Sequence, residues 1–432
     1  MNIRRQSNVF MAIGAIVLGC LSGLLAAEPE AAAEKPNIVF ILADDLGMDG
    51  VGCYGSDTYK TKTPNIDLLA KTGVRFQNCY SAPLCGPSRC EILTGRYAFR
   101  TGGLTNASWQ RNGPGAKAKD EFPIARLLKE NGYATCQAGK WRQVGETPKA
   151  WGFDEYCTDG TAAGWYWQKS YNRNGMVVNT EREVYCPDIV HEFAVDFINR
   201  HKEEPFFLYY ATHLVHLPME RTPDSKPGTT DEKALYADNL AYMDKQVGLI
   251  VKELDRVQLR SKTLIVFSGD NGTAAPFAST IRGQAIDGHK GQMLEGGSRV
   301  PLIANWPGVT PENKVLDDLI DFSDLYPTFA QVAGAQIPRN LKFDGQSFAP
   351  QVRGEPGTPR EWIFVQLGER WYARSGDWKL MRNGNLFDMK AAPIVQIPVG
   401  PNTGDAEPRA AREKLQKVLN SLNPTGGKVE RS

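Results

Sequence analysis

This sequence of 432 residues has few histidines, no closely spaced cysteine pair and almost no net charge. It has only five histidines, and none of its eight cysteines forms a C-x-x-C pair. Structural zinc sites usually combine such pairs with histidines, so a structural zinc is not expected. Lysine plus arginine number 50 against 49 for aspartate plus glutamate. No global field therefore favours a nucleic acid, and any anion must be bound by local charges.

Only one stretch is long and apolar enough to suggest a membrane, and it lies at the N-terminus. Two arginines precede the apolar run 9–27, and an alanine-rich polar stretch follows it. This order is typical of a secretory signal peptide, so we expect residues 1–27 to direct export and to leave no membrane span once cleaved. Two alternatives stay open: an uncleaved signal anchor, and a stretch resembling a bacterial lipoprotein cleavage box, in which Cys20 would be acylated.

Strand-like and helix-like runs alternate from residue 36 to residue 343. The run Ile38 to Ala43 is apolar on both faces, as is typical of a central strand of a parallel sheet covered by helices. The alternation predicts the α/β class, with a doubly wound, mostly parallel sheet flanked by helices over 36–343. Further strand-like runs are 134–138, 205–211, 263–268 and 301–305, and helix-like runs are 66–71, 124–130 and 233–254.

The amino-acid composition changes near residue 344. A stretch rich in proline and glycine is followed by short strand-like runs and then by a helix-like run, 407–420, with Pro408 in its first turn. We expect residues 344–432 to form a small C-terminal subdomain, an antiparallel sheet plus a helix. Its strand-like runs are 362–366, 371–374, 378–381 and 386–388.

Two polar clusters follow predicted strands of the large sheet. Asp44 and Asp45 end the first strand, and Asp270 and Asn271 follow the strand 263–268. Ligands of open α/β sheets gather at the carboxyl ends of the strands. Alone, the first pair is equally typical of a helix N-cap. The two clusters together favour a metal site, and carboxylate and amide oxygens suit calcium or magnesium.

The strongest local pattern is Cys85-Gly-Pro-Ser-Arg89, with Leu93-Thr-Gly-Arg96 expected on the first turns of a helix. As an unmodified thiol, Cys85 would either be a buried residue with only a packing role or an ordinary nucleophile that needs a histidine partner. The segment matches C-x-P-S-R-x(3)-L-T-G-R and so resembles the recognition tag of type I sulfatases, which belong to the alkaline phosphatase superfamily. Their cysteine is oxidised to Cα-formylglycine (3-oxoalanine) by a maturation enzyme, which the resemblance makes an expected partner.

This resemblance to the formylglycine-dependent, arylsulfatase-like family extends over nearly all of residues 36–390. It assigns the large domain to catalysis and implies a bound Ca²⁺, with Mg²⁺ as the alternative. The implied metal contacts are Asp44, Asp45, the modified Cys85, Asp270 and Asn271.

Two further segments match family motifs. Gly288 to Pro301 is similar to GxKxxxxEGGxRVP, which implies that Lys290 contacts the sulfate. Val215 to Pro218 stands where sulfatases carry P-H-x-P, which assigns His216 to the sulfate and the departing alcohol. The first proline of that motif is absent here, so His213 is a rival.

Another segment departs from the family pattern. Gly139 to Trp141 is similar to the start of G-K-W-H-L-G and implies that Lys140 contacts the sulfate, but Arg142 occupies the histidine position. A guanidinium stays protonated, so Arg142 cannot act as a base and is expected to bind an anionic group of the substrate. The base that expels sulfate stays open between His213, His289 and a metal-bound carboxylate.

The resemblance implies hydrolysis of sulfate monoesters. A hydrate of the formylglycine made from Cys85 would attack sulfur, with Arg89 holding this nucleophile, Lys140 and Lys290 binding sulfate oxygens, and His216 protonating the alcohol. Two rival functions stay open: a phosphoester or phosphonate hydrolase of the same superfamily, and a non-catalytic protein that binds sulfated glycans.

An aromatic-rich stretch bears on the substrate. Residues 164–167 read Gly-Trp-Tyr-Trp, and Tyr171 follows. Aromatic rings of this kind stack on sugars, although an ordinary packed loop has the same composition. We therefore expect the substrate to be a sulfated small molecule or saccharide, with a sulfated carbohydrate favoured.

Overall fold

The computed structural model describes residues 35–109, 115–141, 144–159, 166–391, 395–401 and 403–424, and Lys35–Ser432 form one compact unit. The expected signal peptide with Cys20, Arg142 and the residues 164–165 lie outside the described residues. Within the described ranges, no helix combines the length and the hydropathy needed to cross a bilayer.

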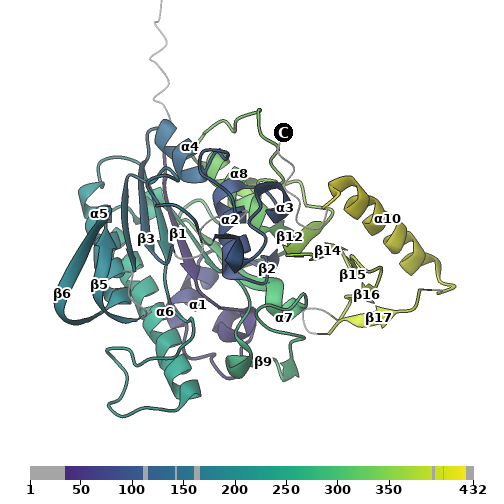
Figure 1. Ribbon diagram of the computed structural model, residues 1–432, viewed down its shortest axis with the longest axis horizontal. Coiled ribbons are helices and arrows are strands. Elements are labelled where there is room, and N and C mark those ends of the chain that lie inside the picture. The colour runs from purple at the N-terminus through teal and green to yellow at the C-terminus, as the bar shows by residue number, and fades with distance from the viewer. Residues whose placement is uncertain are drawn as a thin grey trace, which may run out of the picture. The chain divides into compact units, whose positions relative to one another are not determined.

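A ten-stranded sheet forms the centre of the unit (Figure 1). Its spatial order is β12-β2-β11-β8-β1-β7-β3-β4-β5-β6. The neighbours β8, β1, β7, β3 and β4 are parallel, whereas β11 and β5 run antiparallel to the strands beside them. The strands are β1 (Asn37–Ala43), β2 (Val74–Tyr80), β3 (Ala134–Gly139), β4 (Glu155–Asp159), β5 (Trp167–Arg173), β6 (Met176–Tyr185), β7 (Phe206–Ala211), β8 (Thr263–Gly269), β11 (Arg299–Asn305) and β12 (Lys314–Asp321).

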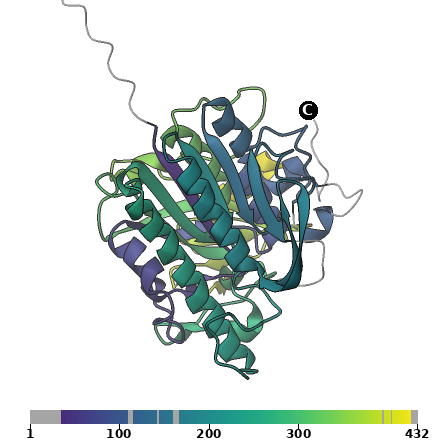
Figure 2. The same ribbon diagram turned by 90° about the vertical axis from the view of Figure 1, so that its left-hand side faces the viewer.

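Helices cover both faces of this sheet, and Figure 2 shows α5 and α6 lying along one of them. In β1, Val39 and Ile41 pack with α1, α5 and α6, whereas Phe40 and Leu42 pack with α2, α4 and α8. The predicted doubly wound α/β fold is confirmed. The helices are α1 (Pro64–Lys71), α2 (Cys85–Thr94), α3 (Ala98–Thr101), α4 (Ile124–Glu130), α5 (Cys186–Arg200), α6 (Glu232–Arg256), α7 (Glu295–Ser298), α8 (Leu325–Val332) and α9 (Ala349–Val352). A small hairpin joins β9 (Thr280–Ile281) to β10 (Gln284–Ala285).

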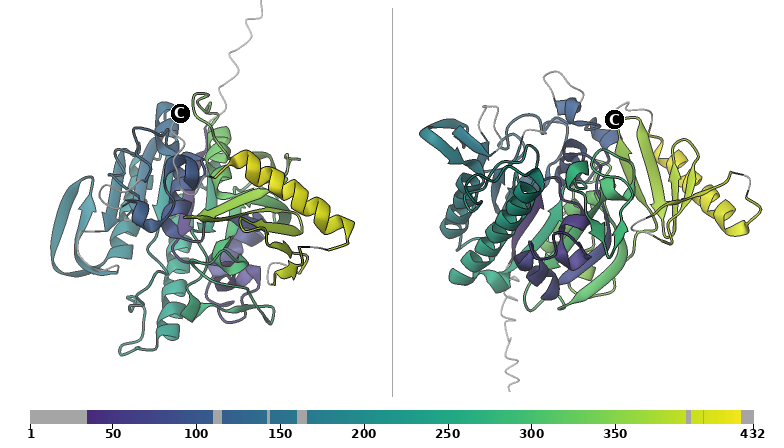
Figure 3. Two further views of the ribbon diagram at one scale, coloured as in Figure 1. Left: turned by 45° about the vertical axis from the view of Figure 1, so that its right-hand side comes forward. Right: turned by 90° about the horizontal axis from the view of Figure 1, so that it is seen from below.

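The C-terminal part forms a separate five-stranded antiparallel sheet with a long final helix, as predicted (Figure 3). The helix α10 (Ala406–Leu422) packs on this sheet through Leu415 and Leu419, in a cluster that also contains Phe99 and Phe364. A second cluster joins the sheet to Tyr80 of β2. The strands are β13 (Ile363–Leu367), β14 (Arg370–Ser375), β15 (Trp378–Met381), β16 (Leu386–Asp388) and β17 (Ile397–Val399).

The strand order determines where the polar side chains meet. The strands β8, β1, β7 and β3 are parallel neighbours, so their carboxyl ends share one edge of the sheet. Asp270, Asp44 and Lys140 directly follow β8, β1 and β3, and His216 lies in the segment after β7. Residues 226 positions apart are thereby brought into contact, as in the hydrogen bond between Asn271 and Asp45.

We predict that Gly269→Ala destabilises the fold. A Cβ atom at this position would lie 1.9 Å from the carbonyl oxygen of Leu46, so the end of β8 and the loop after β1 would be forced apart. The expected loss is about 2 kcal/mol of unfolding free energy, measured by urea denaturation. Gly400→Ala is the control, because nothing lies within 4 Å of its added Cβ. Equal denaturation midpoints for the two variants would contradict this close packing.

Candidate active site

Three carboxylates and one amide meet at the carboxyl edge of the sheet, and all four side chains are fully buried: Asp44, Asp45, Asp270 and Asn271. The backbone N–H of Asp45 donates to Asp270 Oδ1 at 3.0 Å, and Asn271 Nδ2 donates to Asp45 Oδ1 at 3.0 Å. Asp45 has a left-handed φ of 59°, which aspartate tolerates better than most residues. These bonds fix the two predicted clusters against each other.

Cys85 is the first residue of α2 and points at the carboxylates. Its Sγ lies 3.4 Å from Asp44 Oδ1 and 3.7 Å from Asp45 Oδ1. The turn that carries it is held by Ser88, whose Oγ donates to the carbonyl oxygen of Ala82 at 2.8 Å. This contact gives the serine of the C-x-P-S-R pattern a structural reason.

Three cations face the carboxylates, each from a different segment. Arg89 donates to Asp270 Oδ2 at 2.8 and 3.1 Å. Lys290 Nζ donates to Asp45 Oδ2 at 2.6 Å. Lys140 Nζ forms an ion pair with Asp44 and lies 3.5 Å from the sulfur of Cys85. The predicted sulfate-binding lysines therefore flank the Cys85 side chain.

Lys140 reaches this position because Gly139 ends β3 with a left-handed φ of 110°. A Cβ atom at Gly139 would lie 2.0 Å from the carbonyl oxygen of Ala211 in β7, so only glycine permits the close approach. The backbone N–H of Lys140 then donates to that same oxygen at 2.7 Å.

His216 completes the group around the thiol. Its Nε2 lies 3.8 Å from Asp45 Oδ2, and single atoms of Asp44, Asp45, Cys85 and His216 all lie within 4.8 Å of one another. Tyr166 donates to the carbonyl oxygen of His216 at 2.5 Å and holds its segment. Burial lowers the pKa of the imidazole, although Asp44 acts in the opposite direction.

The electrostatic environment differs from one carboxylate of the site to the next. Burial opposes ionisation of Asp44, yet Lys140 and His216 hold the pKa of its carboxyl far below the usual range. For Asp270, burial and the charge of Asp44 outweigh Arg89 and raise the pKa to about 6. Burial and the charge of Asp270 also raise the pKa of the Cys85 thiol, so the unmodified thiol stays neutral and is a weak nucleophile.

The donor set fits a hard divalent cation. Asp44, Asp45, Asp270 and Asn271 offer oxygen ligands, as calcium and magnesium prefer. Asn271 Oδ1 is buried and accepts no hydrogen bond from any residue that the structure describes. Since buried acceptors are nearly always satisfied, this oxygen is the clearest indication of a ligand to an ion.

Several expectations turn out differently. Leu93 and Thr94 end α2 instead of opening a helix, because Gly95 takes the left-handed φ of 66° that caps it, and Arg96 lies beyond. Neither rival histidine belongs to the group around Cys85. His213 Nε2 lies 3.3 Å from Asp159, and His289 Nδ1 lies 3.1 Å from the carbonyl oxygen of Lys290.

The structural roles of Asn106 and Glu295 could not be predicted from the sequence. Asn106 Oδ1 accepts the backbone N–H of Gly86 at 2.8 Å and so steadies the start of α2. Glu295 is fully buried and contacts Tyr80 and Arg374. The EGG motif that contains Glu295 is visible in the sequence, but its partners become apparent only from the fold.

The comparisons with known proteins agree with this geometry. The sulfatase family model matches residues 36–335. Human arylsulfatase D is 31% identical, over 83% of this chain and 75% of its own length. The dog (Canis lupus familiaris) N-acetylgalactosamine-6-sulfatase is 31% identical, over 82% of this chain and 75% of its own.

Solved structures agree as well. Ps i-CgsB superposes with a TM-score of 0.79 at 28% identity, covering 92% of this chain and 96% of its own, and has also been solved in complex with k-i-k-neocarrahexaose. The family match over most of the chain, together with the buried centre around Cys85, leads to one conclusion: the chain belongs to the sulfatase family and is a sulfatase-type hydrolase.

Proposed function

We propose that this protein hydrolyses sulfate monoesters of carbohydrates, with a formylglycine made from Cys85 and a bound calcium ion. The observation that carries the proposal is the buried contact of Cys85 Sγ with Asp44, at 3.4 Å, between Lys140 and Lys290. A sulfate ester placed against this side chain would meet the ammonium groups of Lys140 and Lys290 and the imidazole of His216.

Asp44, Asp45, Asp270 and Asn271 would hold the cation. The formylglycine would supply the nucleophilic oxygen, and the bound cation would withdraw charge from the sulfate oxygens.

The side chains of this centre divide the remaining work. Lys140 and Lys290 neutralise the other sulfate oxygens as charge builds up on them. Arg89 fixes Asp270 through two hydrogen bonds and thereby holds the carboxylate edge rigid. His216 holds a proton for the departing alcohol, at the partly open side of the centre.

A carboxylate is our proposed base for release of sulfate. Asp44 Oδ1 and Asp45 Oδ1 are the acceptors beside the Cys85 side chain, at 3.4 and 3.7 Å. Asp44 is our first choice, because its oxygen is the nearer of the two to the Cys85 side chain. Arg142, which stands where the family has a histidine, is proposed instead to bind an anionic group of the substrate.

The choice of a carbohydrate has two supports. One is the bound k-i-k-neocarrahexaose of Ps i-CgsB, a relative at 28% identity. The other is a cavity of about 560 Å³ beside the segment of His216, lined by Trp167, Glu220 and Arg221. The Trp167 ring packs at 5.1 Å against Tyr185, and its Nε1 donates to the carbonyl oxygen of Arg221. A half-buried indole beside polar groups suits the apolar face of a sugar.

We propose further that the protein is exported, since the N-terminal residues 1–27 have the order of a signal peptide. Its maturation enzyme would then have to act on Cys85 before the chain folds, because this thiol is fully buried in the folded protein.

Mass spectrometry tests the modification. The tryptic peptide that ends at Arg89 should be lighter by about 18 Da after expression with a maturation enzyme, because sulfur is exchanged for oxygen and two hydrogens are removed. Cys90 begins the next tryptic peptide and should keep its thiol mass, which makes it an internal control. Cys85→Ala should lose at least about 1,000-fold in turnover of nitrophenyl sulfate. An active enzyme with an unmodified Cys85 would sink the formylglycine proposal.

Removal of the metal should abolish activity and lower the melting temperature. Without a cation, three buried carboxylates lose a partner, whereas an ion at 100 times its Kd adds about 2.7 kcal/mol of stability. We expect calcium to restore both properties after chelation. Asn271→Ala should show a clearly smaller calcium-dependent rise in melting temperature, because it removes the unsatisfied oxygen. Metal-free protein with unchanged activity would rule out the cation.

Trp167→Ala tests the substrate class. We expect KM for a sulfated oligosaccharide to rise about fivefold, since aromatic contacts contribute roughly 0.5–1.5 kcal/mol. Turnover of nitrophenyl sulfate should stay within about twofold, because none of the side chains around Cys85 lines the cavity that contains the indole. Trp306→Ala is the matched control. Its Nε1 also donates to a backbone carbonyl oxygen, that of Ser261, but Trp306 directly follows β11 and does not line this cavity. Equal effects of Trp167→Ala on both substrates would argue against a saccharide at this cavity.

A further inference from the structure

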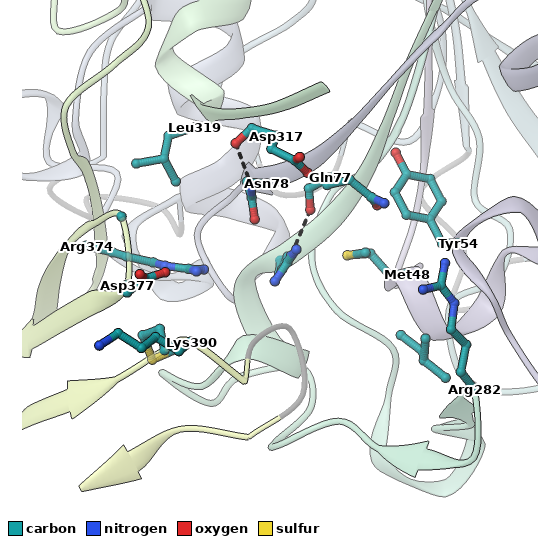
Figure 4. Close-up of a pocket in the computed structure, with 14 residues that line it drawn as sticks. Met48, Tyr54, Gln77, Asn78, Arg282, Asp317, Leu319, Arg374, Asp377 and Lys390 are labelled. Atoms are coloured by element: carbon teal, nitrogen blue, oxygen red, sulfur yellow. Dashed lines mark hydrogen bonds between the residues drawn. The ribbon is translucent and has the colours of Figure 1, made fainter. Parts of the chain in front are cut away.

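A second cavity, of about 410 Å³, lies between the two sheets and away from Cys85 (Figure 4). One wall comes from the large sheet, with Gln77 of β2, Asp317 of β12 and Arg299 of β11. The other comes from the C-terminal sheet, with Arg374 of β14 and the turn that follows it. None of the side chains that form the centre around Cys85 lines this cavity.

Two arginines give the cavity its chemical character. Arg299 and Arg374 are each only 4% exposed, although both line the cavity. Arg374 Nη1 donates to Glu295 Oε2 at 3.0 Å, and Arg299 Nη1 lies 3.7 Å from the same oxygen. Figure 4 shows the Arg374 side chain reaching from β14 into the cavity. One carboxylate thus stands behind two guanidinium groups.

Both arginines keep unsatisfied donors. Arg374 Nε and Arg299 Nη1 are buried and donate no hydrogen bond to any residue within the described part of the chain. A buried donor without a partner costs about 1–3 kcal/mol, so an acceptor bound between the two guanidinium groups would be stabilising.

The charge balance points the same way. The cavity is lined by four cationic side chains and two acidic ones, which leaves two positive charges in excess: Arg282, Arg299, Arg374 and Lys390 against Asp317 and Asp377. Glu295, which lies behind the two arginines, reduces this excess to one positive charge. Burial lowers the pKa of Arg374 to about 10 in spite of Asp377, and it also lowers the pKa of Arg299. An anion bound beside the two guanidinium groups would stabilise their charged form.

We propose that this cavity is a second carbohydrate site, which binds an anionic monosaccharide unit through its carboxylate or sulfate on Arg299 and Arg374. The volume of about 410 Å³ lies within the range of small-molecule sites, roughly 300–1,000 Å³, and far exceeds a bare oxyanion. Tyr54 and Leu319 add apolar wall, and Asn78 adds an amide, as a sugar ring requires. The choice of a sugar rests on the proposed function, whereas the need for an oxyanion does not.

Binding here would link the two sheets, since Arg299 and Arg374 belong to different ones. Arg299 directly follows α7, and α7 begins at Glu295, five residues after Lys290. An anion that neutralises the arginines therefore fixes the same segment that carries Lys290 to the centre around Cys85. We accordingly expect the ligand to raise the melting temperature of the whole protein.

Calorimetry on the full-length mature protein tests this proposal with glucuronate, a sugar that carries a carboxylate and no sulfate ester. Glucuronate should bind with one equivalent and raise the melting temperature, whereas glucose should do neither. Arg374→Gln should weaken binding at least tenfold. Arg126→Gln, which removes a guanidinium that pairs with Glu130 on the surface, should leave the affinity within twofold of that of the unchanged protein.

Binding of inorganic sulfate distinguishes the contribution of the sugar ring to affinity from that of the oxyanion. It should bind to the Arg374-dependent site at least tenfold more weakly than glucuronate, and equal affinity would overturn the saccharide assignment. Lys390→Gln is a second variant in case Arg374→Gln misfolds, because the Lys390 side chain is half exposed and pairs with Glu407 at the surface. It should weaken glucuronate about threefold with nitrophenyl sulfate turnover unchanged.

Glucuronate binding that survives both substitutions would overturn the site. Hydrolysis of nitrophenyl sulfate in the same preparations reports separately on the proposed function. An enzyme that turns over the ester but binds no glucuronate therefore refutes the second site alone.

Discussion

The burial of three carboxylates around one cysteine side chain is the constraint on which the rest of this structure depends. Asp44, Asp45 and Asp270 are fully shielded from water, and buried charges must be compensated. Arg89, Lys140 and Lys290 provide this compensation from three separate segments. The parallel strands hold the carboxylates at one edge of the sheet, so fold and chemistry are specified together. A mutation of any one partner would leave a buried charge and not merely remove a contact.

This constraint also explains why so much of the centre was predictable from the sequence. Asp44 and Asp270 each directly follow a strand that is apolar on both faces, and such strands are recognisable because helices cover them on both sides. Cys85, the proposed source of the nucleophile, lies in a short contiguous motif at the start of α2. The structure brings these predicted residues together because parallel strands end at a common edge. Their individual roles remain predictions that follow from the family.

Other features were not predictable, because no local sequence pattern specifies them. The strands β5 and β6, the last two at one side of the sheet, are largely exposed or only half-buried and therefore lack a clear apolar pattern. The choice between His213, His216 and His289 depends on where the loops after β7 and β8 turn, which no local pattern encodes. Likewise, Glu295 meets Arg374 across 79 residues, so neither the contact nor the cavity beside it has a sequence signal. The loop positions and the cavity depend on contacts between residues far apart in the sequence.

The most direct test of the account is a crystal structure of the mature protein grown with calcium, with the ion located by anomalous scattering. The account predicts one ion whose ligands include oxygens of Asp44, Asp45, Asp270 and Asn271, at about 2.3–2.6 Å, beside the modified residue 85. An ion bound elsewhere, a pair of zinc ions, or Asn271 Oδ1 hydrogen-bonded to the protein with no ion beside it would contradict the central claim.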